Sequence, residues 1–320
     1  MTTLENKIRG ALFGVAVGDA LGAPLEFMDA RDIRHKYGIV KDMIGGGWLN
    51  VKPGEITDDT QMTMAVAKGI VTCKVEPEPF VGAGFIEWLK TNPNDVGNTC
   101  RKAIDGVIQA IKRNPSIQSF EHVVPYKIWE SSAKQVDISN QKKQKRIGNG
   151  ALMRTVYPGL FYGDIDEATR IADRIGRMTH FDNLSAEACR IYTAMIFYSI
   201  RFRMFSKGDL WDIIEKEVLE GTKYKYGDTP IITSSGYVVD TMQCALYCIR
   251  HTGNFHDALV VAANLGGDAD TIAAVTGGLA GAIYGYDNIP NRWSKELHPN
   301  VARELDFYAE KAIENHNARS

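Results

Sequence analysis

The chain has 320 residues, of which 44% are hydrophobic and 24% are charged, and its formal net charge is -2 at pH 7. This length and composition fit a globular protein with a large core, as two ordinary domains or as one large helical domain. The small net charge provides no long-range field toward nucleic acids or anionic membranes, and five cysteines, an odd and low number, argue against a disulfide scaffold.

Helical periodicity dominates the chain from its N-terminus. Apolar residues recur there at i, i+4, i+7, i+8 and i+11, on one face of a helix, at Leu4, Ile8, Ala11, Leu12 and Val15. The same pattern predicts helices, separated by short Gly, Pro or Asn breaks, at residues 60–71, 80–89, 101–112, 167–178, 185–204, 209–219, 237–251, 255–264, 270–284 and 301–316. Only a short stretch near Val123 suggests a strand, and no fixed-period repeat occurs. We therefore predict one all-α domain over residues 1–320.

The sequence offers no clear membrane segment. No apolar run reaches the ~18 residues that a span needs, and the most apolar region, residues 191–205, is interrupted by Arg201 and Arg203. The N-terminus contains Glu5, Lys7 and Arg9 and lacks the apolar core of a signal peptide. We expect a cytoplasmic protein without membrane contact, and a monomer.

Small residues are spaced by four positions in two predicted helices. They are Gly10, Gly14, Gly18 and Gly22 in the first helix, and Ala273, Gly277 and Gly281 in a late one. Glycine costs about 1 kcal/mol relative to alanine inside a helix, so these positions need a packing or functional reason. Close approach of helix backbones in the core accounts for most of them.

Two clusters of carboxylate and hydroxyl side chains stand at predicted helix starts. The first is Thr57, Asp58, Asp59 and Thr60, and the second is Asp268, Asp270 and Thr271. Either cluster alone is typical of a helix cap, because Asp and Thr accept hydrogen bonds from free backbone N–H groups. Together they offer more carboxylates than two caps require, and packed side by side they would repel unless cations bound them. Oxygen ligands suit Mg²⁺ or Mn²⁺, and no nearby His or Cys favours zinc.

Two further patterns each have a sharp and a plain interpretation. The spacing of Cys244, Cys248, His251 and His256 allows a zinc site, but the two cysteines lie one helical turn apart among apolar residues, as small buried hydrophobes do. The basic run, defined as Lys142, Lys143, Lys145 and Arg146, fits a solvated loop, and attraction of an anionic substrate or nucleic acid is the alternative. The plain interpretation is favoured in both cases.

Seven segments then occur in a characteristic order. They are GDALGAPLE at residues 18–26, TDDTQM at 57–62, NDVGNT at 94–99, GNGALMR at 148–154, TH at 179–180, SGYVVDT at 235–241 and GGDADT at 266–271. Each is weakly specific alone, but in combination and order they resemble the ADP-ribosylglycohydrolase family, including its dinitrogenase-reductase-activating type. The resemblance implies a compact orthogonal helical bundle and an enzyme that hydrolyses a glycosidic bond to ADP-ribose.

The resemblance also implies roles for individual residues. Two divalent cations, Mg²⁺ or Mn²⁺, would be held by Thr57, Asp58, Asp59, Asp268, Asp270 and Thr271. Glu26 and Asp95 match catalytic positions near the scissile ribose, and Asp59 is counted with them as a catalytic candidate. The ADP-ribose cleft would be lined by Asn98, Thr99, Cys100, Gly148, Asn149, Gly150, His180, Tyr237, Gly266 and Gly267. The glycines before Trp48 suggest a flexible loop over this cleft, with Trp48 as its anchor or, alternatively, as a contact for a protein substrate.

The expected reaction removes ADP-ribose from a mono-ADP-ribosylated protein. Arginine is the favoured acceptor because residues 95–98 resemble the arginine-specific branch of the family. Cleavage builds oxocarbenium-like charge on the ribose, and Asp95 is our candidate to protonate the departing nitrogen. We expect the pyrophosphate at Gly-rich turns and helix N-termini. Serine-, polymer- or nucleic-acid-linked ADP-ribose is an alternative substrate, and a non-catalytic relative is a third possibility, against which the presence of every matched ligand position argues.

Overall fold

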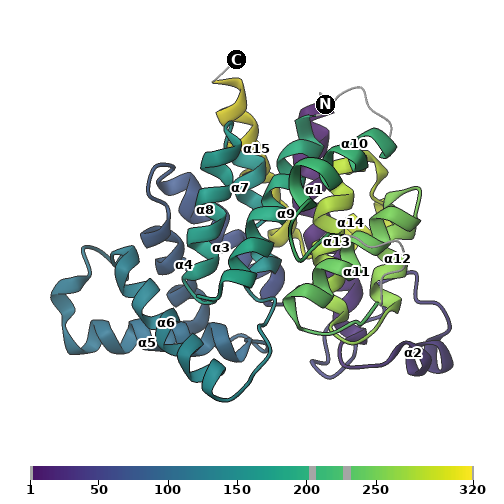
Figure 1. Ribbon diagram of the computed structural model, residues 1–320. Helices are drawn as coiled ribbons and strands as arrows, with labels where there is room; N and C mark the ends of the chain where they lie inside the picture. Colours follow the sequence, from purple (N-terminus) through teal and green to yellow (C-terminus); the bar gives the residue numbers. More distant parts are fainter. Residues whose placement is uncertain (1–2, 202–206, 226–231, 319–320) are drawn as a thin grey trace.

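The computed structural model describes residues 3–201, 207–225 and 232–318, and its regular structure there is helical (Figure 1). The α-helices are α1 (Thr3–Gly22), α2 (Ala30–Tyr37), α3 (Asp58–Thr72), α4 (Glu78–Lys90), α5 (Asn98–Arg113), α6 (Tyr126–Lys142), α7 (Val156–Phe161), α8 (Ile165–Arg177), α9 (Asn183–Arg201), α10 (Lys207–Ile213), α11 (Val238–His251), α12 (Phe255–Asn264), α13 (Ala269–Tyr284), α14 (Asn291–Glu296) and α15 (Pro299–Asn317). Short 3₁₀ turns are η1 (Ala23–Leu25), η2 (Pro115–Ile117), η3 (Leu152–Arg154) and η5 (Tyr286–Asn288), and η4 (Ile214–Leu219) is π-helical.

The all-α prediction is confirmed. Within the described ranges β-type pairing is limited to isolated bridges, and one of them joins Phe120 to Val123, where a short strand was considered. The helix predicted at residues 185–204 is α9, which is described as far as Arg201, and residues 202–204 lie outside the described part. The helix predicted at residues 209–219 consists of α10 followed by the π-helical η4.

Periodicity alone missed several helices, of which α6 is the longest. Its sequence is mostly polar, and only Trp129, Ala133 and Val136 are buried, at the i, i+4 and i+7 spacing of a narrow apolar stripe. Helices α2, α7 and α14, with 8, 6 and 6 residues, are too short for such a stripe to repeat. These elements therefore depend on tertiary contacts more than on a strong local pattern.

The two stripes of small residues lie against each other in an antiparallel contact between α1 and α13, which run side by side in the right half of the molecule (Figure 1). A Cβ atom at Gly14 would lie 2.1 Å from the carbonyl oxygen of Gly277, and one at Gly18 would lie 2.0 Å from that of Ala273. These distances are far shorter than real Cβ contacts, so the two backbones touch along the stripe. Close approach is thus the packing reason that the glycines require.

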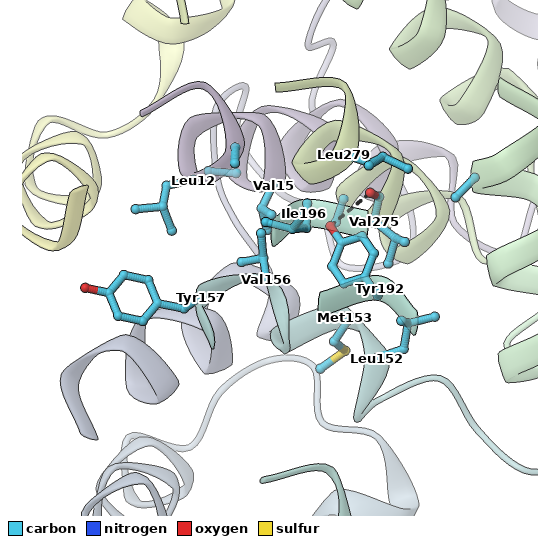
Figure 2. Packing of buried hydrophobic residues seen from close by; sticks show 14 of the residues in the cluster. Leu12, Val15, Leu152, Met153, Val156, Tyr157, Tyr192, Ile196, Val275 and Leu279 are labelled. Carbon is cyan, nitrogen blue, oxygen red and sulfur yellow. Dashed lines mark hydrogen bonds between the residues drawn. The ribbon is translucent and has the colours of Figure 1, made fainter. Parts of the chain in front are cut away.

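Buried side chains from α1, α7, α9 and α13 surround this contact (Figure 2). Tyr192 of α9 is fully buried, and its hydroxyl donates a hydrogen bond to the carbonyl oxygen of Val275 at 3.0 Å. Tyr157 of α7 likewise donates to the carbonyl oxygen of Tyr308 in α15 at 2.9 Å. These two buried tyrosine hydroxyls therefore have hydrogen-bond partners, as most buried polar groups do.

The segment Thr3–Leu25, α1 with η1, is long and apolar enough to cross a membrane by length and composition, which the search for apolar runs did not anticipate. In the structure 94% of its most apolar window is buried inside the protein. Its apolar surface is used against α13, α15 and α9.

The Cys–His pattern extends over α11 and the first turn of α12. Cys244 and Cys248 are buried in α11, whereas His256 stacks on the Trp293 ring at a centroid distance of 5.1 Å. The ring of His251 lies 4.6 Å from that of Tyr247. Among the described residues, none of these four side chains belongs to a group arranged to hold a metal ion, which supports the plain interpretation.

The contact between α1 and α13 predicts the effect of a single methyl group. We expect Gly14→Ala to lower the free energy of unfolding by about 1–3 kcal/mol, because the added Cβ meets a backbone carbonyl that cannot rotate away. The control is Gly84→Ala in α4, where the new Cβ would lie 3.3 Å from the Cβ of Ala65 and the gain in helix propensity is up to about 1 kcal/mol. Denaturant unfolding of both variants measures the difference, and equal stabilities would contradict the close contact.

Candidate functional site

The antiparallel pairing of α1 and α13 brings the two acidic clusters together, because the end of α1 lies beside the start of α13. Asp19, near that end of α1, is fully buried and also contacts the start of α3. Its carboxylate accepts hydrogen bonds from the backbone N–H groups of Thr57 and Thr60, at 3.0 and 3.1 Å, and from both threonine hydroxyls. Asp19 is therefore the cap of α3, supplied from another helix.

The residues at the two helix starts do not act as caps themselves. Thr57 and Asp268 occupy the N-cap positions of α3 and α13, but neither side chain makes a capping hydrogen bond. Asp59 and Asp270 are 0% and 1% exposed, and one carboxylate oxygen of each has no hydrogen-bond partner. The capping interpretation of the two clusters therefore fails, and buried oxygen atoms are left available for a ligand.

Carboxylates from both clusters and from the end of η1 converge. One oxygen each from Glu26, Asp268 and Asp270 lie within 4.8 Å of one another. The hydroxyls of Thr57 and Thr271 lie 3.4 and 3.3 Å from the same oxygen of Asp59. All candidate metal-ligand atoms in this group are oxygens, the ligand type that Mg²⁺ and Mn²⁺ prefer. The unpartnered oxygens and this donor set fit divalent cations.

Burial and mutual repulsion change the proton affinity of these acids. Burial, followed by the charges of Asp95 and Asp19, raises the pKa of Asp58 to about 8. Burial raises the pKa of Glu26 to about 8 as well, and it is the main cause that raises the pKa values of Asp59 and Asp270 well above the ordinary range. Without cations, burial and mutual repulsion therefore favour the protonated forms of these acids.

A turn of two glycines precedes the second acidic cluster and sets the direction in which the chain enters α13. Gly266 and Gly267 have φ angles of +69° and +66°, which favour glycine, and a Cβ at Gly267 would lie 1.6 Å from the carbonyl oxygen of Ser234. Asn149 then fixes Asp268, because its amide nitrogen donates to the Asp268 carboxylate at 2.6 Å. The turn and this amide together orient Asp268 before α13 begins.

The acidic group forms one wall of a cleft of about 720 Å³. Its lining includes the predicted catalytic residues Glu26 and Asp95 and these predicted ligands and substrate contacts: Asp58, Asp268, Asp270, Thr271, Asn98, Thr99, Cys100, Gly148, Asn149, Gly150, His180 and Gly267. Thr57 and Asp59 are buried and lie outside the lining. Tyr237 and Gly266 also lie outside it: Tyr237 immediately precedes α11, with its ring beneath Arg146, and Gly266 pairs with Asp29.

Glu26 is held at the cleft by Trp48. The indole N–H of Trp48 donates to a carboxylate oxygen of Glu26 at 2.5 Å, and both residues line the cleft. Asp95 lies on the loop before α5, and its charge contributes to the raised pKa of both Glu26 and Asp58. Burial, followed by the charge of Asp268, raises the pKa of Asp95 itself. Glu26 can therefore hold a proton near neutral pH, and the raised pKa of Asp95 favours its protonated form.

A buried hydrogen-bond chain sets the protonation of His180. Arg154 is fully buried, and its guanidinium donates to the Thr179 hydroxyl at 2.7 Å and to the carbonyl oxygen of Gly150 at 3.0 Å. The Thr179 oxygen lies 2.8 Å from Nδ1 of His180, while burial and the Arg154 charge lower the pKa of His180 to about 3. The lowered pKa keeps the His180 ring neutral, and the contact with Thr179 engages its Nδ1 atom.

The basic run lies next to the cleft without forming part of its lining. Lys142 ends α6, and the side chains of the run are exposed, as the solvated interpretation predicts. Lys145 and Arg146 also line a small neighbouring cavity of about 100 Å³ that shares Thr99, Gly148 and His180 with the cleft. The idea that the run attracts an anionic substrate stays a prediction.

Three functional features were missed by residue patterns alone. Asp19 belongs to the first matched segment, and a lone carboxylate within an apolar helix was a signal for its buried role. Glu26 was expected to be catalytic, but its proximity to Asp268 and Asp270 also places it among candidate ligands. The connection of Arg154 to His180 has no local signal, because it joins residues of two separate segments through the fold.

Comparisons with known proteins identify relatives that match nearly the whole chain. The sequence profile described as ADP-ribosylglycohydrolase matches residues 1–319. The ADP-ribosyl-dinitrogen-reductase glycohydrolase of Rhodospirillum rubrum is 34% identical over 308 residues, which cover 95% of this chain and 94% of the relative. The ADP-ribosylarginine hydrolase Tri1 of Serratia proteamaculans is 32% identical over 321 residues, covering 95% and 80%. A solved structure described as an ADP-ribosylglycohydrolase-related protein complex has a TM-score of 0.73 at 26% identity, covering 98% of this chain and 99% of that one.

The chain combines an all-α fold with a cleft lined by carboxylates, and these matches extend over nearly the whole chain. The chain belongs to the ADP-ribosylglycohydrolase family. The family resemblance and the assignment as a hydrolase are thereby confirmed.

The raised carboxylate pKa values predict how the metal-free protein responds to pH. Aspartate and glutamate titrate at about pH 4 in the unfolded chain, whereas Asp58 and Glu26 titrate at about pH 8 in the folded protein. Between these two pH values the folded state binds more protons than the unfolded state. Stability therefore falls as pH rises through this window. We expect Asp59→Asn, which removes one buried charge, to raise the melting temperature in EDTA, with an advantage over the unmodified chain that grows from pH 5 to pH 8.

The control for this measurement is Asp212→Asn, which removes the same charge from an exposed position on α10. Thermal denaturation of the three proteins in EDTA, at several pH values, provides the comparison. An Asp59→Asn advantage that is independent of pH would show that the carboxylate cluster does not titrate in this window.

Proposed function

We propose that this chain uses two divalent cations to remove ADP-ribose from mono-ADP-ribosylated arginine in proteins. The observation that carries the proposal is the meeting of two acidic helix starts, with unpartnered buried oxygens on Asp59 and Asp270, at the wall of a cleft of about 720 Å³. The names of two relatives, which refer to ADP-ribosyl-dinitrogen reductase and to ADP-ribosylarginine, support a protein-linked substrate and arginine as its acceptor.

The candidate ligands for the cations are Thr57, Asp58, Asp59, Asp268, Asp270 and Thr271, with Glu26 beside them. Bound divalent cations would neutralise the carboxylates, hold the ribose 2′- and 3′-hydroxyls and lower the pKa of a water molecule. Neutralisation matters here because burial makes the bare cluster unfavourable in its charged form. Mg²⁺ and Mn²⁺ both suit an oxygen-only group.

The proton needed by the leaving group comes from the chain itself in this mechanism. Asp95 lines the cleft with a raised pKa, so it can carry a proton to the departing guanidine nitrogen. Once deprotonated, Asp95 carries negative charge beside the ribose on which positive charge develops. Glu26, whose pKa is about 8, is the second group able to hold or accept a proton at this end of the cleft.

The start of α5 at the cleft suits the pyrophosphate. Asn98, Thr99 and Cys100 form the first turn of α5 and line the cleft, and this turn contains no acidic residue. The free backbone N–H groups and the helix dipole at such a terminus favour an anion. His180 adds a neutral ring to the same cleft, and Thr179 engages its Nδ1 atom.

Removal of one carboxylate from each cluster tests the cation assignment. For Asp58→Asn/Asp270→Asn we expect a loss of about a thousandfold or more in ADP-ribose release from an arginine-linked peptide, on the scale of lost electrostatic stabilisation. Rates are measured with Mg²⁺, with Mn²⁺ and with EDTA, and Asp212→Asn is the charge-matched control. Near-normal, cation-dependent release by the double variant would overturn the assignment.

The same assay distinguishes the substrates when it is run on arginine-, serine-, polymer- and DNA-linked ADP-ribose. Preferential turnover of the arginine linkage is the expected outcome. Faster turnover of another linkage would replace the arginine proposal, and ADP-ribose binding without any turnover would indicate a binding protein.

The role of Asp95 is tested by changing the leaving group. Asp95→Ala should lower kcat for arginine-linked ADP-ribose by about 10²–10⁴-fold, the usual contribution of a general acid. The comparison substrate is an ADP-ribosyl 4-nitrophenyl ether of the same anomeric configuration. Its leaving group, 4-nitrophenolate, is stable without protonation, so its hydrolysis should be far less affected. Equal losses on both substrates would remove Asp95 from the proton-transfer role.

A further inference from the structure

Two large aromatic side chains stand exposed at the cleft that contains Glu26. Phe27 is 70% exposed and Trp48 is 52% exposed, and both belong to the lining. Their ring centroids are 5.3 Å apart with an interplanar angle of 42°. Exposed aromatic surface of this kind at a cleft is a feature of recognition sites, and the reaction described above makes no use of it.

The backbone at Phe27 is held in an unfavourable conformation to present this ring. Its φ angle is +63°, in the left-handed region that bulky residues avoid. The Phe27 N–H donates to the carbonyl oxygen of Gly267 at 2.6 Å, and the Gly267 N–H donates to that of Met28 at 2.7 Å. Strain of this kind persists only where surrounding contacts fix it, and here they tie Phe27 to the turn that precedes Asp268.

Trp48 is fixed independently. Its indole N–H is bonded to Glu26, and it follows three glycines with φ angles of +66°, +89° and +72°. A Cβ at the last of them, Gly47, would lie 2.8 Å from Cα of Pro24, so the loop rests closely on the η1 turn. The polar edge of the indole is thus engaged by the candidate catalytic carboxylate, while half of the side chain remains exposed.

The ionisable residues that share the cleft with the two rings are acidic or neutral. Glu26, Asp95 and Asp268 line the same cleft, and no lysine or arginine does so in the part of the chain that the structure describes. Neither ring is paired with a cation among the described residues. Aromatic faces beside carboxylates, without a cation from the protein, are the environment that a guanidinium group prefers.

We propose that Phe27 and Trp48 form the platform that binds the acceptor arginine side chain of the ADP-ribosylated protein. This inference rests on the proposed function, since it assigns the acceptor end of the same cleft. The guanidinium stacks on the aromatic pair, and Trp48 couples this contact to Glu26 through its hydrogen bond. The pyrophosphate is assigned to the start of α5, so the rings remain for the acceptor.

Equilibrium binding isolates the platform from catalysis. In an Asp95→Ala background with Mg²⁺, calorimetry compares an arginine-linked peptide with free ADP-ribose, which lacks the acceptor. We expect Phe27→Gly/Trp48→Leu to weaken peptide binding by about tenfold more than it weakens ADP-ribose binding. Gly is chosen at position 27 because it adopts the positive φ without strain. Trp48→Phe, which retains a ring but not the N–H, should retain most of the peptide affinity.

The control variant is Phe120→Ala, which removes an equally exposed phenyl ring (68%) from the loop before α6, and melting temperatures verify folding of all proteins. Equal weakening for peptide and ADP-ribose would overturn the platform and assign the rings to adenosine. Unchanged peptide affinity in the double variant would also overturn the platform, even if the unsubstituted protein cleaves arginine linkages. If that chain binds the peptide more tightly than ADP-ribose but cleaves no arginine linkage, the proposed function fails and the platform stands.

Discussion

The contact between α1 and α13 is the constraint on which the rest of the structure depends. A backbone-to-backbone approach over several turns is available only to residues with no side chain or a methyl group, and Gly10, Gly14, Gly277 and Gly281 supply it. Because the two helices are antiparallel, the end of one lies at the start of the other. This single geometric fact brings Asp19, the η1 turn with Glu26, and the α13 acidic cluster to one place.

The site built at this place is unfavourable by itself. Several carboxylates share a buried volume, and burial raises their pKa values, to about 8 for Asp58 and Glu26. The close packing of the surrounding helices holds them there despite the repulsion. Such local instability is common where a protein must bind charge or stabilise a developing charge, and it is compensated by the stability of the remaining fold.

The sequence predicted the helical class and most long helices, because their apolar faces repeat at 3.6 residues. It also identified both acidic clusters and both small-residue stripes. No local sequence pattern, however, indicated that the two stripes pack against each other. Helix α6 was missed because only Trp129, Ala133 and Val136 carry its pattern. The contacts of Trp48 with Glu26 and of Arg154 with Thr179 join segments that are distant in the sequence. They arise from tertiary structure, so no residue spacing in the sequence predicts them.

The cap that Asp19 provides to α3 has an evolutionary consequence. Because the helix start is capped from α1, neither Asp58 nor Asp59 serves as the N-cap, and their replacement by neutral residues removes repulsion. A neutral residue that keeps the hydrogen bonds of Asp59 with Thr57 and Thr271 therefore carries little structural penalty at position 59. A lineage released from selection for catalysis can discard these residues and keep its fold, which is a simple physical route from an enzyme of this architecture to a folded pseudoenzyme.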